Sequence, residues 1–436
     1  MAARSGKQYL DSIRANQPVV YLNGRRVEDV TAEPTFAGPL RSIMEQYDLQ
    51  LDDRYRDIML STDDETGEDH STGFLVPRSR DDLVRRRQHF KLRADHTFGF
   101  MGRAPDFMNG LVTDFYLIRS IFATAEQRFA DNVAANYLRI RNEDLFLTHT
   151  LVNPQVDRSR NSADQEDPFI HLGKVGETKE GIIVRGAKML ATMAPLTEET
   201  MVYPFGGIQP GDERYALGFF LANNTPGLRY ICRETIAPGP RSRFDHPLSS
   251  RFEEMDCVAV FDDVLVPWDR VFIDGSDASR DICNELRPRE GVVAVQTAAR
   301  MLANLEFFCG LAMRLADATG INGFLHIQEK LGEMLDELEL FRACFYGAEA
   351  LGKENPANGV WSVHQPSLVA ANIRAPKVYP RLVEIVKILA GGGFFYAPSE
   401  ADLANPSCAR TSTATCAAGK ASTPSGACRC SSWPGT

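Results

Sequence analysis

The sequence predicts an α+β fold in which a helical region, a β region and a second helical region follow one another. Apolar residues recur every three or four positions before about residue 142 and again after about residue 279, which is the spacing of helices packed on a core. Between residues 143 and 278, short apolar runs are separated by turns that contain glycine and proline, a pattern typical of β-strands. Strands and helices do not alternate there, so a parallel nucleotide-binding sheet is disfavoured.

Residues 1–142 are interpreted as a mainly helical N-terminal domain. Ser79 stands three residues before Asp82, which is the spacing of a serine that caps the first turn of a helix. Further on, one apolar stripe predicts a single long helix, and its residues are Phe122, Ala125, Phe129, Val133 and Tyr137.

Residues 143–278 are interpreted as a central antiparallel β domain. The stretch GETKEGIIVRGAKMLA (176–191) has a glycine-containing turn followed by isoleucine and valine. RYALGFFLANNTPGLRYICRE (214–234) predicts two short strands around an Asn-Thr-Pro-Gly turn, and DCVAVFDDVLVPWDRVFI (256–273) predicts another pair with Pro267 between them. Short strands with such turns indicate an antiparallel sheet or a barrel.

Residues 279–406 are interpreted as a C-terminal helical bundle. Two long amphipathic helices are predicted for residues 291–320, which end in a glycine, and for residues 324–352. A third is predicted for residues 379–393, with Pro380 in its first turn. The three glycines at its end could cradle a phosphate, but a helix end is the favoured interpretation.

The composition excludes several classes of protein. The 436 residues are 44% hydrophobic, which is enough for a large core, and the formal net charge of -10 disfavours a nucleic-acid partner. No apolar run approaches the roughly 20 residues of a membrane helix, and the N-terminus lacks a signal peptide, so we expect a cytoplasmic protein with no membrane partner. Five scattered cysteines are expected to be small core residues: Cys232, Cys257, Cys283, Cys309 and Cys344.

Familiar catalytic motifs are absent from the sequence. There is no GxGxxG motif after a strand, no GxxxxGK[ST] phosphate loop, no HExxH and no GxSxG nucleophile turn. The eight histidines lack metal-ligand spacing, so no metal site is predicted. The chain is therefore not expected to bind a nicotinamide dinucleotide in the usual way or to hydrolyse a nucleoside triphosphate.

Five stretches nevertheless form a specific pattern, in this order: FGFMGRAPDF (98–107), THTLVNPQVDR (148–158), VRGAKMLATMAPL (184–196), FDHPLSSRFEEMD (244–256) and FDDVLVPWDRVFI (261–273). With them, the chain resembles the oxygenase components of 4-hydroxyphenylacetate 3-monooxygenase and related two-component, FAD-dependent enzymes. The resemblance implies an acyl-CoA dehydrogenase-like fold, with an N-terminal helical domain, a central β domain and a C-terminal four-helix bundle. It agrees with the three regions read from periodicity.

The resemblance also implies the chemistry of an oxidoreductase of aromatic catabolism. In this family a separate NAD(P)H:flavin reductase supplies reduced FAD by diffusion. The oxygenase binds that FAD, captures O₂ as a C4a-hydroperoxyflavin and transfers one oxygen atom ortho to the hydroxyl of a phenolic substrate. The hydride chemistry would lie on another polypeptide, which explains the missing dinucleotide motif. A homo-oligomer, either a tetramer or a dimer, is expected.

The matching motif positions imply the site residues. Arg103 and His149 would be catalytic and would contact the substrate together with Phe107, while the cofactor would be held by His149, Asn153, Gln155, Arg158 and Thr192. Ionising a phenol near pH 7 costs about 4 kcal/mol, and a cation at about 4 Å can supply that much. Arg103 could equally stabilise the flavin hydroperoxide, and Arg158 could instead form a buried ion pair with Asp157 or Asp245.

The sequence departs from the family pattern in the site. Relatives that act on phenols usually carry a tyrosine where this chain has Phe107, and Leu190 replaces a polar residue. The lost hydroxyl would remove one hydrogen bond to a charged group, worth about 1.5 to 3 kcal/mol. The sequence therefore predicts aromatic hydroxylation but does not name the phenol.

The larger departure is residues 407–436, in which Ala, Ser, Thr, Gly, Pro and four cysteines replace any apolar periodicity. We interpret this stretch as a disordered tail or a segment translated out of frame, because GC-rich codons shifted by one base can spell a helix of the family. The bundle would then be truncated, and we expect weak FAD binding, exposed bundle surface and aggregation.

Two rival functions follow from the same fold. A 4-hydroxybutyryl-CoA dehydratase-like enzyme would need closely spaced cysteines for an iron–sulfur cluster, yet no cysteine precedes Cys232. The second rival is an inactive truncated remnant, which should not retain reduced FAD.

Overall fold

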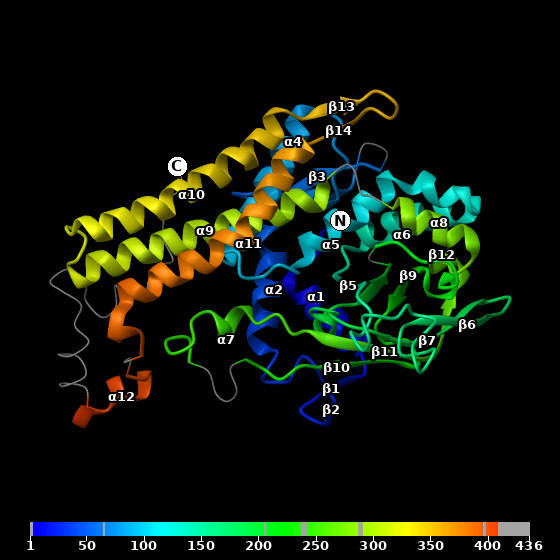
Figure 1. Cartoon of the computed structure of the whole chain (residues 1–436), viewed down its shortest axis with the longest axis horizontal. Coiled ribbons are helices and arrows are strands. Elements are labelled where there is room, and N and C mark those ends of the chain that lie inside the picture. The colour runs from blue at the N-terminus through cyan, green and yellow to red at the C-terminus, as the bar shows by residue number, and fades with distance from the viewer. Residues whose placement is uncertain are drawn as a thin grey trace.

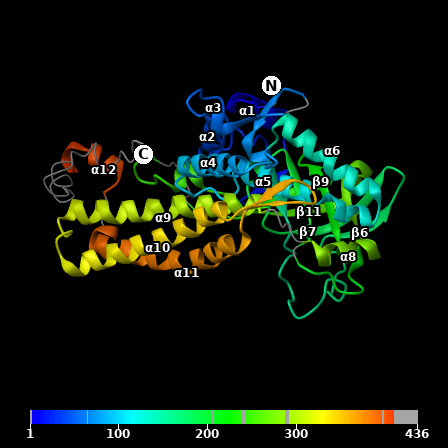
Figure 2. The ribbon, with the colours of Figure 1, turned by 90° about the horizontal axis from the view of Figure 1, so that it is seen from above.

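The computed structural model describes residues 3–63, 66–204, 206–236, 242–286, 291–395 and 398–408. Within these residues the α+β class is confirmed (Figure 1). Some helices from the first third of the chain lie between the sheets and a long helical bundle, and the bundle projects away from the sheets (Figure 2).

The N-terminal region is mainly helical, as predicted. Its helices are α1 (Gly6–Ala15), α2 (Ala37–Leu49), α3 (Arg56–Met59), α4 (Arg80–His96), α5 (Pro105–Leu117) and α6 (Gln127–Glu143). Ser79 caps α4 as expected, because its side chain accepts a hydrogen bond from the Asp82 N–H. The single helix predicted from the stripe at Phe122–Tyr137 is wrong at its start. Residues 119–124 form a 3-10 helix, and the extended backbone of Glu126 separates it from α6.

The sequence also missed short strands in this region. They are β1 (Val20–Leu22), β2 (Arg25–Val27), β3 (Leu60–Thr62) and β4 (Asp69–Ser71). The first two join the large central sheet, because β1 runs parallel to β10 (Leu228–Cys232). The N-terminal region therefore contributes to the sheet as well as to the helices.

Two sheets form the central region. The larger has the strand order β2-β1-β10-β11-β7-β6 and the smaller the order β12-β9-β8-β5. The remaining bounds are β5 (Leu147–Thr150), β6 (Gly173–Glu177), β7 (Gly181–Lys188), β8 (Glu199–Val202), β9 (Leu217–Ala222), β11 (Cys257–Pro267) and β12 (Val271–Asp274). The ladders are antiparallel as predicted, except for the parallel pairs β1–β10 and β5–β8. Two short helices accompany the sheets, α7 (Ser249–Phe252) and α8 (Asp277–Glu285).

The bundle contains α9 (Val292–Thr319), α10 (Leu325–Ala350) and α11 (Gln365–Ala390), with a hairpin of β13 (Lys353–Asn355) and β14 (Val360–Ser362) between the last two. The glycine end of α9 is confirmed, since Gly320 has a φ of 69°. The predicted start of the third helix is wrong. It begins at Gln365, and Pro376 and Pro380 lie inside it, so packing along α9 and α10 outweighs the hydrogen bonds that proline removes. The glycines after Ala390 end α11, as predicted.

Helix α9 is the core of the bundle. It is long and apolar enough to cross a membrane by length and composition alone, with a mean hydropathy of 1.2, contrary to the expectation that no apolar run approaches that length. Of that apolar window, 61% is buried against the rest of the described chain, as in a core helix. This burial makes α9 weak evidence for a membrane span.

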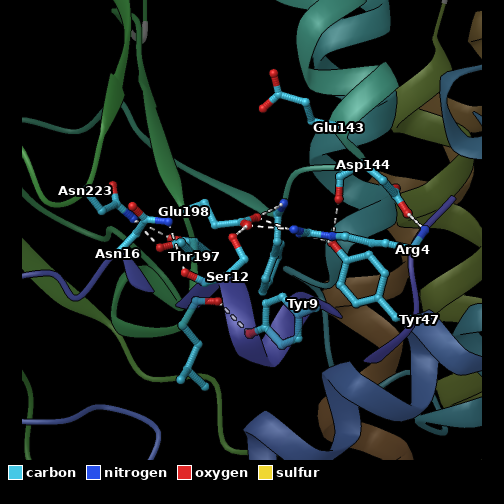
Figure 3. Close-up of polar contacts among 12 residues, drawn as sticks. Arg4, Tyr9, Ser12, Asn16, Tyr47, Glu143, Asp144, Thr197, Glu198 and Asn223 are labelled. Atoms are coloured by element: carbon cyan, nitrogen blue, oxygen red, sulfur yellow. Dashed lines mark hydrogen bonds and ion pairs between the residues drawn. The ribbon is translucent and has the colours of Figure 1, made fainter. Parts of the chain in front are cut away.

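A buried ion pair fixes the N-terminal segment across the β region (Figure 3). The Arg4 guanidinium donates to both carboxylate oxygens of Glu198, at 2.7 and 2.6 Å. The Arg4 N–H donates to Asp144, and its side chain also donates to the Tyr47 hydroxyl at 3.1 Å. Glu198 further accepts the Phe146 N–H at 2.8 Å. These contacts join the segment before α1, helix α2 and the α6–β5 connection around one pair of charges.

The end of the described chain is α12 (Glu400–Ala404) and the four residues after it. The interpretation of residues 407–436 as an aberrant tail falls outside the described residues from position 409 onward.

Candidate active site

Arg103 lies in the tight connection between α4 and α5. Gly99 has a φ of +70°, and a Cβ there would overlap the Arg300 carbonyl oxygen of α9. A Cβ at Gly102 would meet the Arg300 side chain at 3.2 Å. The two glycines therefore let this loop approach α9 closely, and Pro105 then starts α5 in its first turn.

Three of the expected site residues meet at the end of this loop. Arg103 Nε donates a hydrogen bond to His149 Nε2 at 3.0 Å. The Arg103 guanidinium carbon lies 3.9 Å from the centre of the Phe107 ring, a cation–π distance. The Phe107 and His149 ring centroids are 5.2 Å apart. A cation, an imidazole and an apolar ring thus form one group.

His149 lies near the end of β5 and is 6% exposed. Its Nδ1 lies 3.0 Å from the Tyr203 hydroxyl, and its Nε2 accepts from Arg103. Burial, and then the charge of Arg103, lower the pKa of His149 to about 3. The ring is therefore neutral at pH 7, with its proton on Nδ1 directed at Tyr203.

Sequence reasoning missed Tyr203. It follows β8, which runs parallel to β5 with His149 opposite Met201, so the two strand ends lie together. Its ring stacks on His149 at 5.8 Å and meets Phe115 edge-on at 5.2 Å. Burial raises the pKa of Tyr203, so its hydroxyl stays protonated. The only sequence signal was a polar aromatic residue directly after a strand.

Glu254 was also missed. Its carboxylate accepts the Arg103 backbone N–H, and it interacts electrostatically with Arg103 and Arg300. Burial raises the pKa of Glu254, and burial lowers the pKa of Arg300, opposed by the charge of Glu254. The carboxylate therefore fixes the Arg103 loop against the segment before β11.

Thr192 lies beside this group. Its carbonyl accepts a hydrogen bond of 2.6 Å from the Thr148 hydroxyl, which ties its loop to β5 one residue before His149. The Thr192 hydroxyl donates to Asp256 Oδ1, also at 2.6 Å. Leu190 and Met193 on either side have positive φ angles of 65°, so the loop holds a tight, specific shape.

Asn153 is held in place by Lys188 of β7. The Lys188 ammonium donates to Asn153 Oδ1 at 2.7 Å and to the Leu151 carbonyl at 3.2 Å. Burial lowers the pKa of Lys188 to about 8. The following turn is held by His171, whose Nε2 lies 3.0 Å from the Pro154 carbonyl. The Asn153-Pro154 turn is thus fixed behind β5.

Gln155 and Arg158 lie on the exposed loop that follows and are not brought to the Arg103–His149 group. The alternative ion pairs of Arg158 are not formed. Asp157 pairs with Arg160 at 3.3 Å, and Asp245 accepts the Glu400 N–H.

The donor set fits a reduced flavin. The Thr192 hydroxyl donates to Asp256, so its oxygen lone pairs can accept an N–H of the reduced ring. The Asn153 amide nitrogen and the exposed Arg158 guanidinium are donors suited to carbonyl and phosphate oxygens. Among the described residues, no group of three or more His, Cys, Asp or Glu side chains is arranged for a metal.

Comparison with known proteins supports the family resemblance seen in the sequence motifs, along almost the whole chain. Residues 5–273 match the family described as 4-hydroxyphenylacetate 3-hydroxylase N terminal, and residues 287–418 match its C-terminal counterpart. The chain is 42% identical over 407 residues to the 4-hydroxyphenylacetate 3-monooxygenase oxygenase component of Thermus thermophilus. That match covers 93% of this chain and 82% of the relative.

Solved structures agree. A crystal structure of an oxygenase component of 4-hydroxyphenylacetate 3-monooxygenase, complexed with FAD and 4-hydroxyphenylacetate, superposes with a TM-score of 0.87. It is 41% identical and covers 93% of this chain and 83% of that one. A 4-hydroxybutyryl-CoA dehydratase from N. maritimus superposes with a TM-score of 0.83 at 20% identity, covering 96% and 83% of the two chains, and shows the fold alone.

Proposed function

The chain belongs to the 4-hydroxyphenylacetate 3-hydroxylase family, and from that premise we propose how its own residues serve the reaction. It is the oxygenase component of an FAD-dependent aromatic monooxygenase, and it hydroxylates a phenolic substrate ortho to its hydroxyl. The dehydratase alternative is not favoured, because that relative shares 20% identity where the oxygenase components share 41 to 42%.

We propose that Thr192 and Asn153 hold the flavin ring and its side chain, and that Gln155 and Arg158 close on its phosphates from the exposed loop. When bound, reduced FAD supplies the activated oxygen. Asp256 acts indirectly, by fixing the Thr192 hydroxyl so that its lone pairs face the ring. His149 borders the same proposed flavin site, because the hydroxyl of its neighbour Thr148 donates to the Thr192 carbonyl.

Arg103 is proposed to stabilise the substrate as a phenolate. A guanidinium has five N–H donors, and Arg103 uses Nε on His149 and one Nη on the Gly102 carbonyl. The remaining donors can bind a phenol oxygen. A cation about 4 Å away supplies about 4 kcal/mol at an effective dielectric near 20, which is the cost of ionising a phenol at pH 7. This Arg103–His149 contact is the observation that carries the proposal.

His149 is proposed to aim Arg103 and, when Arg103 turns to the substrate, to accept a hydrogen bond from the phenol hydroxyl. As arranged, both ring nitrogens are engaged, one by Arg103 and one by Tyr203. Nε2 becomes a free acceptor once the Arg103 Nε–H moves to the phenol oxygen. Phe107 forms the apolar wall against which the substrate ring packs.

The partners are a separate NAD(P)H:flavin reductase and a small phenol. We further propose that reduced FAD reaches the chain by diffusion in the cytoplasm, and that the chain forms a homo-oligomer. Support for the oligomer comes from exposed apolar side chains on α10 and α11, which include Leu325 at 80% and Ile373 at 58% exposure.

The test is anaerobic mixing of the full chain with reduced FAD, followed by oxygen and a panel of phenols. We expect a catechol product that carries one atom of labelled O₂, and an Arg103→Lys variant that forms it more slowly. Binding of a chromogenic phenol should also show the ionised form in the wild type and less of it in the variant. Failure to hydroxylate any phenol while reduced FAD remains bound would overturn the proposal.

A further inference from the structure

Two cysteines face one another across neighbouring strands of the larger sheet. Cys232 ends β10 and Cys257 begins β11, and the antiparallel register places them directly opposite. Their sulfur atoms are 3.6 Å apart, and both thiols are free. The mechanism proposed above uses neither.

The backbone around the pair suits a disulfide. The next residues along the ladder, Arg233 and Asp256, are joined by a hydrogen bond of 3.0 Å from the Arg233 N–H to the Asp256 carbonyl. Hydrogen-bonded and non-hydrogen-bonded pairs alternate along antiparallel strands, so Cys232 and Cys257 form a non-hydrogen-bonded pair, in which Cα atoms are about 4.5 Å apart. That spacing lies in the range of natural disulfides, about 4.4 to 6.8 Å.

The two thiols differ in access. Cys232 is half-buried and lines a solvent-open cavity of about 430 Å³, together with Tyr21, Asn23, Gly24, Arg229 and Ile231. Cys257 is 3% exposed, and burial raises the pKa of its thiol well above the usual range. An oxidant from solvent therefore reaches the Cys232 sulfur first, while the neighbouring Cys257 sulfur is shielded from solvent.

We propose that Cys232 and Cys257 form a peroxide-sensitive, reversible disulfide site. Hydrogen peroxide oxidises the Cys232 sulfur to a sulfenic acid and leaves as one water. The Cys257 sulfur then attacks the Cys232 sulfur, and the hydroxyl departs with the Cys257 proton as a second water. Two electrons pass from the two sulfurs to the peroxide, and a thiol reductant returns both cysteines to the free state.

The oxidant has a source in the chain itself, and this step rests on the proposed function. A reduced flavin that meets O₂ without a substrate yields oxidised flavin and hydrogen peroxide. The cysteine pair also lies next to the loop that contains Thr192, the residue proposed to bind the flavin. The Cys257 carbonyl accepts the Ala191 N–H at 2.9 Å, and Asp256 accepts a hydrogen bond from the Thr192 hydroxyl. Drawing β10 and β11 together should therefore disturb the Thr192 loop and weaken the binding of reduced FAD.

The test treats the full chain with added hydrogen peroxide, so it does not depend on turnover. After alkylation, trypsin should release YICR (230–233) joined to FEEMDCVAVFDDVLVPWDR (252–270), lighter than the two peptides by two hydrogen atoms. Dithiothreitol should separate them. Absence of this cross-link at peroxide concentrations that oxidise the half-buried Cys344 would overturn the proposal, as would its formation only in denatured protein.

Matched variants separate the site from general oxidation. Cys232→Ser should keep its activity and lose the cross-linked peptide, whereas Cys344→Ser should form it as the wild type does. Cys257→Ala should instead accumulate a sulfenic acid on Cys232 that a dimedone probe traps. Peroxide should lower reduced-FAD affinity in the wild type and not in Cys232→Ser, and equal loss in both would contradict the link to the Thr192 loop.

Discussion

Tyr203 lies with its hydroxyl 3.0 Å from His149 Nδ1, on the side of the imidazole opposite Arg103. Since Arg103 Nε can only donate, His149 Nε2 must accept and Nδ1 must carry the proton. Arg103 therefore selects this tautomer, and the Tyr203 hydroxyl stabilises it by accepting a hydrogen bond from Nδ1–H. Tyr203 is a positioning residue, because it acts on Arg103 through the ring between them.

We expect Tyr203→Phe to lower kcat/KM for the phenol by about fivefold to tenfold, the effect of losing one hydrogen bond worth about 1 to 1.4 kcal/mol. The pH profile of kcat should also change, because the imidazole proton can then move to Nε2 and break the Arg103 contact. Tyr215→Phe is the matched control, since it loses one hydroxyl bond to the Pro168 carbonyl away from this group. An unchanged pH profile in Tyr203→Phe would contradict the positioning role.

Phe107→Tyr should tighten phenol binding. The centre of the Phe107 ring lies 3.9 Å from the guanidinium carbon of Arg103. An added hydroxyl would therefore lie close to a cation and to the expected position of the substrate oxygen. One hydrogen bond to a charged group is worth about 1.5 to 3 kcal/mol, or roughly tenfold to a hundredfold in the dissociation constant. Equilibrium titration with a phenol panel measures it, and Phe107→Leu should show no gain. Weaker binding in Phe107→Tyr would mean that the substrate oxygen lies elsewhere.

Local patterns predicted the features that depend on neighbouring residues and missed those that depend on packing or on distant strand pairing. The Ser79 cap and the Gly320 helix end depend on neighbours in sequence, and both were found. The start of α11 was missed because the proline rule is local, whereas the helix is held by its packing on α9 and α10. β1 and β2 were missed because they are short strands, stabilised by pairing with β10 far along the chain.

The site shows the same limit. Arg103, His149 and Thr192 were found through motif positions, and the structure brings them together. Tyr203 was not, since its place beside His149 follows from the parallel β5–β8 register, and no local pattern carries that register. Gln155 and Arg158 share a motif with His149, yet they lie on the exposed loop because the chain turns at Pro154.

Stability should fall in acid, and His149 should contribute to the fall. The pKa of His149 is lowered to about 3, below the usual 6.5, so between these values the unfolded chain binds the proton and the folded chain does not. The contribution of His149 to the free energy of unfolding is therefore fully present above about pH 6.5. It is lost as the pH falls toward 3, at up to about 1.4 kcal/mol per pH unit.

Chemical denaturation of the wild type and His149→Gln across pH 4.5 to 8 measures this contribution. The two free energies of unfolding should run parallel above about pH 7, where the imidazole is neutral in both states. Below about pH 6.5, the wild-type curve should fall more steeply. Curves that stay parallel over the whole range would show that His149 protonates equally in both states.

Arg4→Ala should destabilise the fold far more than loss of an ordinary surface ion pair. The side chains of Arg4 and Glu198 are only 11% and 5% exposed, so the variant leaves a buried carboxylate without its cation. Breaking such a pair costs about 3 to 5 kcal/mol. Lys7→Ala is the control, because Lys7 contacts Asp11 at the same 2.6 Å while the two side chains are 81% and 50% exposed, and exposed pairs are worth about 0 to 1 kcal/mol.

A double variant, Arg4→Met with Glu198→Gln, separates the charge from the packing. It removes both charges while keeping side chains of similar volume, so it should recover part of the stability that Arg4→Ala loses. Recovery will be incomplete, because Glu198 also accepts the Phe146 N–H and the Ser12 hydroxyl, and a neutral amide accepts these bonds less strongly. The measurement is urea denaturation at pH 7.5. If Arg4→Ala and Lys7→Ala lose equal free energy of unfolding, the buried pair does not hold the N-terminal segment, and the contacts of Tyr9 and Tyr47 must do so instead.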